Sequence, residues 1–502
     1  MWEGIQGAFT PESIAVVILG VLLGLIIGAI PGLTATFGIA LLIPVTFLMP
    51  PEAGMIMLSG IYAGAIYGGS ISAILLNIPG TPASIVSAWE GHTLVTQGRA
   101  PLALSLSAIS SGIGGLSSGL ALFFLTPPLA QITLAFGAPE YVALVLFSLI
   151  VVIVMLESPL VANTLAALLG LLLASVGLDP VQGMPRFIFG FYPLMSGLNV
   201  VAVLVGFFCL PQAFVLARES LDGVRYGTIG KIGAAKLADV LGQLKRRVGT
   251  LLRASGIGTV LGILPAIGPE TTPFVCHALE RRFAPKTEAF GKGSVQGLIA
   301  VETSNSANVG GSLIPLLALG IPGSGAAAVF IGALTLHGLR PGPLLFAEQT
   351  SIVYSFFMGF IFVNLFMTVV GLFGARYFAA VLRLPKGALA AFITFFSIFG
   401  AYAVNNSLFD VWVMFAAGLL ALVLGALGIP ILPVVLGFIL GGLLEQNLAV
   451  LRATADGPGY LYLLERPITL VLLAASVLIL LTAIWRRTIR RKNAPGSAVS
   501  VP

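Results

Sequence analysis

The chain places hydroxyl and amide side chains beside a helix-breaking sequence in two apolar segments. The first segment is GGSISAILLNIPGTP, residues 68–82, and the second is GGSLIPLLALGIPGSG, residues 310–325. A proline-glycine pair does not continue an α-helix, and a broken helix leaves backbone N–H and C=O groups without intrahelical partners. Lipid cannot pair those groups, so they must face protein, water or a ligand. Each break is therefore a candidate binding site.

A second pair of breaks repeats in the same order along the chain. Residues 20–37, GVLLGLIIGAIPGLTATF, return as residues 258–274, GTVLGILPAIGPETTPF. The spacing is about 240 residues for both pairs, and such a fixed offset indicates an internal duplication. We therefore predict two structural repeats, each with two broken segments.

The breaks offer ligands for an anion and for a cation. Thr81 followed by Pro82 is typical of a helix N-cap, and Ser324 can cap a helix in the second repeat. A helix N-terminus attracts anions, whereas unwound carbonyls and the oxygens of Ser, Thr and Asn are hard ligands that suit sodium. No Lys or Arg lies within the four breaks. A bound anion would therefore depend on N-termini, hydroxyls, amides and bound cations.

The predicted substrate- and cation-binding residues, among which a sodium ion could also bind, flank the four breaks. They are Pro31, Gly32, Thr34, Thr36, Gly68, Gly69, Ser70, Ser72, Asn77, Pro79, Gly80, Thr81, Pro269, Glu270, Thr271, Thr272, Asn305, Asn308, Gly310, Gly311, Ser312, Pro322, Gly323 and Ser324. A competing interpretation is that some glycines only let helices pack closely. These glycines are Gly20, Gly24, Gly28, Gly68 and Gly69.

Two acidic residues lie in apolar surroundings in the second repeat, Glu270 and Glu302. An ionisable residue inside a membrane is a functional candidate. Glu270 follows Pro269, where an acid in a first helical turn can equally serve as a cap. Asp410 and Glu445 are expected at span ends or in bonds to neighbouring helices.

The composition is that of an integral membrane protein. Of 502 residues, 58% are hydrophobic and 9% are charged, which is too few charges to cover a water-soluble surface. The apolar segments make room for about 11 to 13 membrane-crossing or re-entrant segments, and their length favours helices over barrel strands. We predict an all-α polytopic membrane protein with two inverted structural repeats and broken or re-entrant helices.

The cysteines and histidines show no metal or disulfide pattern. Cys209 and Cys276 lie in or beside apolar segments without paired spacing and are expected to be packing residues. His92, His277 and His337 are scattered, which favours loop or interface positions over a zinc site.

The basic residues are clustered, and clusters near span ends mark the cytoplasmic face. Five lie in the tail, and twelve of the 25 lie between residues 218 and 292. The tail residues are Arg486, Arg487, Arg490, Arg491 and Lys492, and the central ones are Arg218, Arg225, Lys231, Lys236, Lys245, Arg246, Arg247, Arg253, Arg281, Arg282, Lys286 and Lys292. This distribution favours a topogenic, lipid-facing role over nucleic-acid binding.

The charge pattern predicts opposite orientations for the two repeats. Residues 255–278 have basic residues on both flanks, so they are expected to enter and leave by the cytoplasmic face as a re-entrant hairpin. The first copy has no Lys or Arg near either end, so both its ends are expected outside, with a periplasmic N-terminus.

The predicted domain boundaries follow from the repeats and the charges. The first membrane repeat spans 1–217, a basic cytoplasmic connector 218–254, the second membrane repeat 255–465, a final transmembrane helix 466–485, and a basic cytoplasmic tail 486–502.

Inverted repeats with interrupted helices are typical of secondary transporters that work by alternating access. A channel fits the matched breaks less well. An intramembrane lipid enzyme would need His, Asp, Glu or Cys clustered at one depth, and no such cluster or P-loop is present. We therefore predict a transporter that is not an enzyme, with no catalytic residues and no organic cofactor.

Six motifs in order resemble the large permease subunit of the tripartite tricarboxylate transporter family, the TctA type. The resemblance covers about residues 13 to 470. The motifs are residues 28–47, 67–84, 262–274, 302–334, 400–414 (GAYAVNNSLFDVWVM) and 436–448 (LGFILGGLLEQNL).

The resemblance implies a bacterial inner-membrane system that imports a carboxylate such as citrate. It implies two partners, a small four-helix membrane subunit and a periplasmic solute-binding protein, and sodium or a proton as the coupling ion. A stand-alone carrier of organic anions without a binding protein remains the alternative. We expect a mobile part with the four breaks to move against a scaffold that includes residues 101–127.

Overall fold

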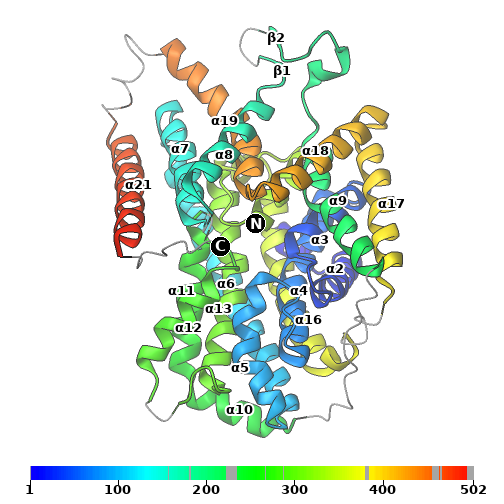
Figure 1. Ribbon diagram of the computed structural model, residues 1–502, viewed down its shortest axis with the longest axis vertical. Helices are drawn as coiled ribbons and strands as arrows, with labels where there is room; N and C mark the ends of the chain where they lie inside the picture. Colours follow the sequence, from blue (N-terminus) through cyan, green and yellow to red (C-terminus); the bar gives the residue numbers. More distant parts are fainter. Residues whose placement is uncertain are drawn as a thin grey trace, which may run out of the picture. The chain divides into compact units, whose positions relative to one another are not determined.

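Helices account for nearly all regular structure in this computed structural model (Figure 1). The structure describes residues 2–156, 158–179, 183–221, 235–265, 267–285, 288–378, 384–454, 463 and 466–493. Within these ranges, the side chains of residues 375–376 and 486–493 are not described. The predicted residues Arg225, Lys231 and Lys286 and the side chains of the basic tail therefore lie outside the described part.

The described residues of the first half form nine α-helices and a short strand pair. Its elements are α1 (Trp2–Gly7), α2 (Pro11–Ala29), α3 (Ala35–Thr46), α4 (Pro51–Leu76), η1 (Pro82–Ser84), α5 (Ile85–Thr96), α6 (Ala100–Thr133), α7 (Ala138–Met155), α8 (Leu160–Ala174), β1 (Gly177–Leu178), β2 (Pro185–Arg186), η2 (Tyr192–Ser196) and α9 (Val200–Leu221). Strands β1 and β2 pair antiparallel.

The second half continues with helices alone among its described residues. They are α10 (Leu237–Arg246), α11 (Val248–Ile263), α12 (Thr272–Phe283), α13 (Val295–Leu319), α14 (Gly325–Leu336), α15 (Pro343–Glu348), α16 (Thr350–Phe378), α17 (Lys386–Asn405), α18 (Leu408–Ala426), α19 (Ile431–Thr454) and α21 (Pro467–Asn493). The predicted connector, residues 218–254, thus contains the end of α9, all of α10 and the start of α11.

Ten described helices are long and apolar enough to cross a membrane, and four shorter helices are also apolar. The ten are α2, α4, α6, α7, α9, α16, α17, α18, α19 and α21, and the shorter ones are α3, α8, α11 and α14. This confirms the predicted all-α polytopic membrane fold. Cys209 and Cys276 are buried and unpaired, in agreement with a packing role.

The chain divides into two compact units. The first comprises Met1–Ala135 and Leu198–Leu427, and the second Phe136–Gly197 and Gly428–Pro502. Every predicted binding residue lies in the first unit. The second unit holds α7, α8, the strand pair, α19 and α21.

Helix α2 runs parallel to α4 at close backbone contact. Gly20, Gly24 and Gly28 face the backbone of α4, and a Cβ added at Gly28 would overlap the carbonyl oxygen of Ala65. Only a glycine at each contact permits this approach. The packing interpretation of these α2 glycines is therefore confirmed.

The second half repeats this arrangement with α11 and α13. Gly258 faces the carbonyl oxygen of Ser304, and Gly262 faces that of Asn308, so α11 also runs parallel to its partner helix. Helix α3 turns back along α4, and α12 turns back along α13. The two halves thus build the same three-helix group.

Further helix pairs also match between the halves. Helix α6 packs on α13 as α16 packs on α4, and α19 packs on α7 and α8 as α9 packs on α17 and α18. The central helices α4 and α13 run antiparallel, because Tyr62 lies beside Ser312 whereas Ser70 lies beside Glu302. The two central helices therefore run in opposite directions, and the inverted duplication of the whole chain stays a prediction.

Helix α6, which contains the predicted scaffold residues 101–127, belongs to the same compact unit as the breaks. Its assignment to a scaffold stays a prediction. Its small residues let it approach closely: a Cβ at Gly114 would meet the backbone of Thr303 in α13. The glycines and serines of this helix thus serve contact with the broken helices.

The hairpin of α11 and α12 begins and ends at one level, as its basic flanks predict. Arg253 near the start of α11 donates 3.1 Å from Nε to Oε2 of Glu280 near the end of α12. Burial alone would raise the pKa of Glu280, but hydrogen bonds from Arg253, Thr250 and Gln296 hold that pKa below its usual range. Helices α10 and α12 lie towards the same lower end of the first unit in Figure 1.

A buried carboxylate joins the two halves near this end. Glu90 of α5 is fully buried and accepts hydrogen bonds from the backbone N–H groups of Gly291, Gly293 and Ser294, at 2.7, 3.1 and 2.8 Å. His277 Nε2 lies 2.7 Å from the same carboxylate. The segment leading into α13 is thus held by a residue from the first half.

The contact between α2 and α4 yields a stability prediction. We expect Gly28→Ala to lower the melting temperature of the purified protein or to prevent folding, because overpacking a close contact costs about 1–3 kcal/mol or more. Gly256→Ala is the control, since this exposed position in α11 has no neighbour within 4 Å of the added methyl group. The control should match or exceed the wild type, and equal melting temperatures for both variants would contradict the packing argument.

Candidate functional site

The two breaks of the first half touch each other. The N–H of Gly32, between α2 and α3, donates 3.1 Å to the carbonyl of Gly80, between α4 and α5. The N–H of Gly80 faces the carbonyl of Gly69 at 3.4 Å. The chain after α4 therefore folds back along that helix, and backbone groups from one break pair with those of the other.

The two breaks of the second half form a matching pair. The N–H of Gly323 faces the carbonyl of Ser312 at 3.4 Å, so the chain folds back along α13. Asn308 of α13 donates from Nδ2 to Ile267 O at 2.9 Å and to Thr272 Oγ1 at 2.7 Å. This side chain fixes the break between α11 and α12.

Both long helices end in the same backbone conformation. Asn77 closes α4 at φ 58° and ψ 26°, and Gly320 closes α13 at φ 75° and ψ 17°. The left-handed region suits glycine and is tolerated by asparagine. A conformational role thus accounts for Asn77 at the end of an apolar helix.

Both residues that the sequence predicts as helix N-caps occupy that position. Ser324 accepts 3.1 Å from Ala327 N at the start of α14. Thr81 precedes only the short 3₁₀ helix η1, and its hydroxyl has no hydrogen-bond partner. Thr81 is therefore the N-cap of η1 with Pro82 at the first helical position, as predicted, but Ser84 Oγ, and not the hydroxyl of Thr81, bonds the N–H and the carbonyl of Thr81.

Several buried polar atoms at the breaks lack hydrogen-bond partners. They are Thr81 Oγ1, both side-chain atoms of Asn305, and Asn308 Oδ1. Buried polar groups are paired in the great majority of cases, so unpaired ones indicate a ligand or water position. Asn305 and Ser312 are seven residues apart and share one face of α13. The unpaired groups thus belong to the faces that carry the breaks.

A tyrosine that the sequence analysis did not select lies between the halves. Tyr62 of α4 is fully buried, and its hydroxyl lies 3.1 Å from Ser312 Oγ and 2.8 Å from Ser324 Oγ. Its place in α4 matches that of Asn305 in α13, since each precedes a fold-back contact (Gly69 or Ser312) by seven residues. Comparing the two repeats position by position could have found it.

The breaks flank the middle of the antiparallel pair α4 and α13. The second-half break reaches α4 at Tyr62, and the first-half break reaches it at Gly69. Seven residues of helix separate these levels by about 10 Å along the axis. One carboxylate ligand could therefore lie between the two breaks.

Some predicted site residues are exposed and others have clear packing roles. Gly32, Asn77, Glu270 and Thr271 are exposed. Glu270 precedes the N-cap of α12 and lies outside the helix. Four further residues make packing or local contacts: Gly68 with Leu25, Gly310 with Ser118, Gly311 with Thr259, and Ser72 with Gly69 O.

The remaining predicted residues complete the breaks. Thr34 caps α3 by accepting 3.2 Å from Phe37 N, Thr36 is buried in the first turn of α3, and Ser70 Oγ lies 3.4 Å from Ser87 Oγ. The prolines lie in the non-helical segments that the sequence predicts: Pro31, Pro79, Pro269 and Pro322.

Other acids and histidines have structural partners. Asp410 accepts from Asn405 at 2.8 Å, and Glu445 pairs with Arg186. His92 Nδ1 lies 3.1 Å from Ile74 O, and His337 Nε2 lies 3.4 Å from Thr46 Oγ1. Among the described residues, no three His, Cys, Asp or Glu side chains group as a metal site.

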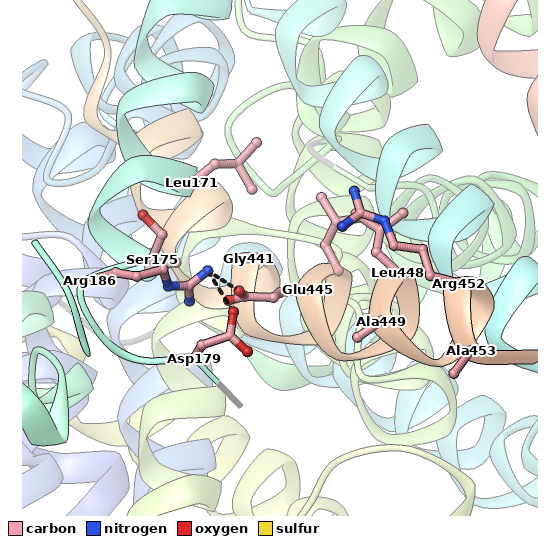
Figure 2. Close-up of a pocket in the computed structure, with 12 residues that line it drawn as sticks. Leu171, Ser175, Asp179, Arg186, Gly441, Glu445, Leu448, Ala449, Arg452 and Ala453 are labelled. Atoms are coloured by element: carbon pink, nitrogen blue, oxygen red, sulfur yellow. Dashed lines mark ion pairs between the residues drawn. The ribbon is translucent and has the colours of Figure 1, made fainter. Parts of the chain in front are cut away.

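Two cavities lie away from the breaks. One of about 600 Å³ is in the second unit, where Arg186 points to Glu445 and Asp179 (Figure 2). The other, of about 570 Å³, is lined by Trp89, His277 and neighbouring residues of the first unit. Neither cavity is lined by a predicted binding residue.

Comparison with known proteins gives one family. Residues 14–436 match the Tripartite tricarboxylate transporter TctA family. The chain is 34% identical over 477 residues, 94% of this chain and 93% of the relative, to "Uncharacterized 52.8 kDa protein in TAR-I ttuC' 3'region" of Agrobacterium vitis. It is 30% identical over 227 residues, 45% of this chain and 93% of the relative, to "Uncharacterized protein in TAR-II ttuC' 3'region" of the same organism. No solved structure matches the chain.

The left-handed residue at the end of α4 gives a test of its role. Asn77→Ala should lower the free energy of unfolding by about 1 kcal/mol, since alanine disfavours this conformation, whereas Asn77→Gly should not. Gly320→Ala is the matched variant in the other half and should lose a similar amount. Thermal unfolding of the purified proteins measures this, and an Asn77→Ala variant as stable as the wild type would contradict the cap.

Proposed function

Because the chain belongs to the tripartite tricarboxylate transporter TctA family, we propose that it is the large membrane subunit of a carboxylate importer. The substrate is a tricarboxylate such as citrate, or a related di- or tricarboxylate. Import proceeds by alternating access coupled to an inward flow of sodium or protons. The chain is a multi-pass membrane protein, and its membrane is the bacterial inner membrane.

The observation that carries this proposal is the set of unpaired buried groups at the paired breaks. Thr81 Oγ1 and both polar side-chain atoms of Asn305 have no protein partner, and Asn308 has an unpaired acceptor, Oδ1. A carboxylate accepts hydrogen bonds from the hydroxyl of Thr81, from Nδ2 of Asn305 and from the N-terminus of α14, which follows the second break. Asn308 Oδ1 can instead serve as a ligand of a cation. The matched breaks of the two repeats are the place where secondary transporters bind their substrates.

Charge explains why a coupling cation is part of the proposal. Moving a trianion into a cell against 100 mV costs about 7 kcal/mol, at about 2.3 kcal/mol per charge. No Lys or Arg lies within the breaks to neutralise the substrate. A co-transported cation would offset both the membrane potential and the missing positive charge.

The proposal also fixes orientation and partners. The basic end with Arg253, Arg281 and Arg282 lies in the cytoplasm, as does the C-terminus, and the N-terminus is periplasmic. A periplasmic solute-binding protein delivers the substrate, and a small four-helix membrane subunit completes the complex. The alternative function is a stand-alone carrier of organic anions, for which the same breaks would be the site.

Transport by site variants tests the proposed function. In vesicles with the small subunit and the binding protein, Asn305→Ala should lower citrate uptake about ten-fold or more, since a hydrogen bond to a charged group is worth about 1.5–3 kcal/mol. Asn308→Ala should also lower citrate uptake, because it removes the unpaired Oδ1 and the bonds that fix the break between α11 and α12. Asn77→Gly keeps the cap but removes the amide, so reduced uptake would show that the amide serves the ligand.

Asn447→Ala is the matched control, because Asn447 lies in the second unit and bonds only its own helix at Leu443 O. It should keep wild-type uptake and membrane insertion. Wild-type uptake by both Asn305→Ala and Asn308→Ala would overturn the site, and uptake unchanged without the binding protein would favour the stand-alone carrier.

A further inference from the structure

Glu302 is a fully buried carboxyl group that the proposed carboxylate site does not use. It belongs to α13 and has no exposed surface. In the described part of the chain, no Lys, Arg or His forms an ion pair with it. A lone carboxylate at such a position is costly unless another positive charge neutralises it.

Hydroxyl groups from three other helices lie next to Glu302. They come from Ser70 of α4, Ser87 of α5, and Ser107 and Ser111 of α6. Ser111 donates 3.0 Å to Oε2, whereas Oε1 and the hydroxyl of Ser107 have no hydrogen-bond partner. The carboxylate thus lies among hydroxyl oxygens, and some of these oxygen atoms are free to bind a cation.

Packing alone does not explain an acid at this position. When the halves are matched by their fold-back contacts, Gly69 with Ser312, the position of Glu302 corresponds to Ser59. The Ser59 hydroxyl donates 2.8 Å to Ile56 O of its own helix. A small serine that bonds its own backbone is therefore sufficient where the repeat needs only close packing. The charge in the second half has a separate role.

The chemistry of these ligands points to a monovalent hard cation. Carboxylate and hydroxyl oxygens are hard ligands, and one negative charge balances one sodium ion. A divalent ion generally recruits more carboxylates, and no three acidic, His or Cys side chains group together in the described residues. Sodium therefore fits this oxygen set best.

The position also connects the site to the first-half break. Ser70 follows Gly69, whose carbonyl faces the N–H of Gly80. Glu302 lies three residues before Asn305 and so neighbours it on the surface of α13. A cation here would place positive charge beside the unpaired amide of Asn305.

We propose that Glu302, with Ser70, Ser87, Ser107 and Ser111, binds a sodium ion beside the first-half break. Its role as the coupling ion rests on the proposed function, whereas the binding itself does not. Glu302 supplies the negative charge, and the serine hydroxyls complete the oxygen shell. The site exists in one repeat only, because Ser59 replaces the acid in the other.

Direct sodium binding to the purified full-length protein tests the proposal. Radioactive sodium binding and the rise of melting temperature with sodium, against choline as the inert cation, are measured together. The wild type should bind sodium saturably, Glu302→Gln should weaken binding about ten-fold or more, and Ser111→Ala should weaken it by a smaller factor.

Two controls keep the charge loss and the hydroxyl loss separate. Asp410→Asn makes the same acid-to-amide change at another buried acid, and Ser59→Ala removes the hydroxyl at the matching position. Both should bind sodium as the wild type does. If Glu302→Gln does not fold, Ser107→Ala and Ser111→Ala together carry the test, and wild-type sodium affinity in that double variant overturns the proposal.

Each outcome separates this site from the proposed function. Wild-type sodium affinity in folded Glu302→Gln overturns the site, even where citrate uptake remains sodium-driven. The site is also overturned if the wild type binds no sodium and if Glu302→Gln is as stable as the wild type at low pH. That result would indicate a protonated carboxyl group at Glu302. Sodium binding that depends on Glu302 in a protein without citrate uptake supports the site and counts against the proposed function.

Discussion

The whole arrangement depends on one constraint: a helix can be interrupted inside a bilayer only where its freed backbone groups find partners in the protein. Here the partners are other interruptions. Gly32 bonds Gly80 across the first pair of breaks, and Gly323 returns to Ser312 in the second. These contacts require α2 to approach α4, and α11 to approach α13, at a separation that only glycine contacts such as Gly28 allow. The small residues therefore make the breaks possible, and the breaks supply the polar groups.

Helices α4 and α13 pack antiparallel and occupy corresponding places in the two halves. Their side chains at corresponding positions nevertheless differ in chemistry. Where α4 carries Tyr62, which satisfies the hydroxyls of the opposite break, α13 carries Asn305, whose amide is unpaired. Where α4 carries Ser59, α13 carries Glu302. One break is closed by the protein itself and the other keeps free ligands. Two similar halves thus carry different polar groups at corresponding positions.

Much of this could be predicted from the sequence, because prolines, glycines and charges act locally. The four breaks follow from Pro-Gly pairs, and the hairpin that returns to its own level follows from basic flanks that include Arg253. What could not be predicted depends on contacts between distant segments. Tyr62 looks like a packing residue in an apolar run, since its partners are 250 and 262 residues away. The partner of α6 could not be predicted either, because a face of small residues does not specify which helix it contacts, and here Gly114 lies against Thr303 of α13.

The carboxylate of Glu90 also bears on how such a protein can move. It joins α5, from the first half, to the backbone amides of Gly291, Gly293 and Ser294, which directly precede α13 in the second half. Pulling these segments apart would strand a fully buried acid without its donors, at a cost of several kcal/mol. The contact between the two halves at Glu90 is therefore expected to resist opening. The broken segments of the two halves are therefore held together at this end by one buried carboxylate.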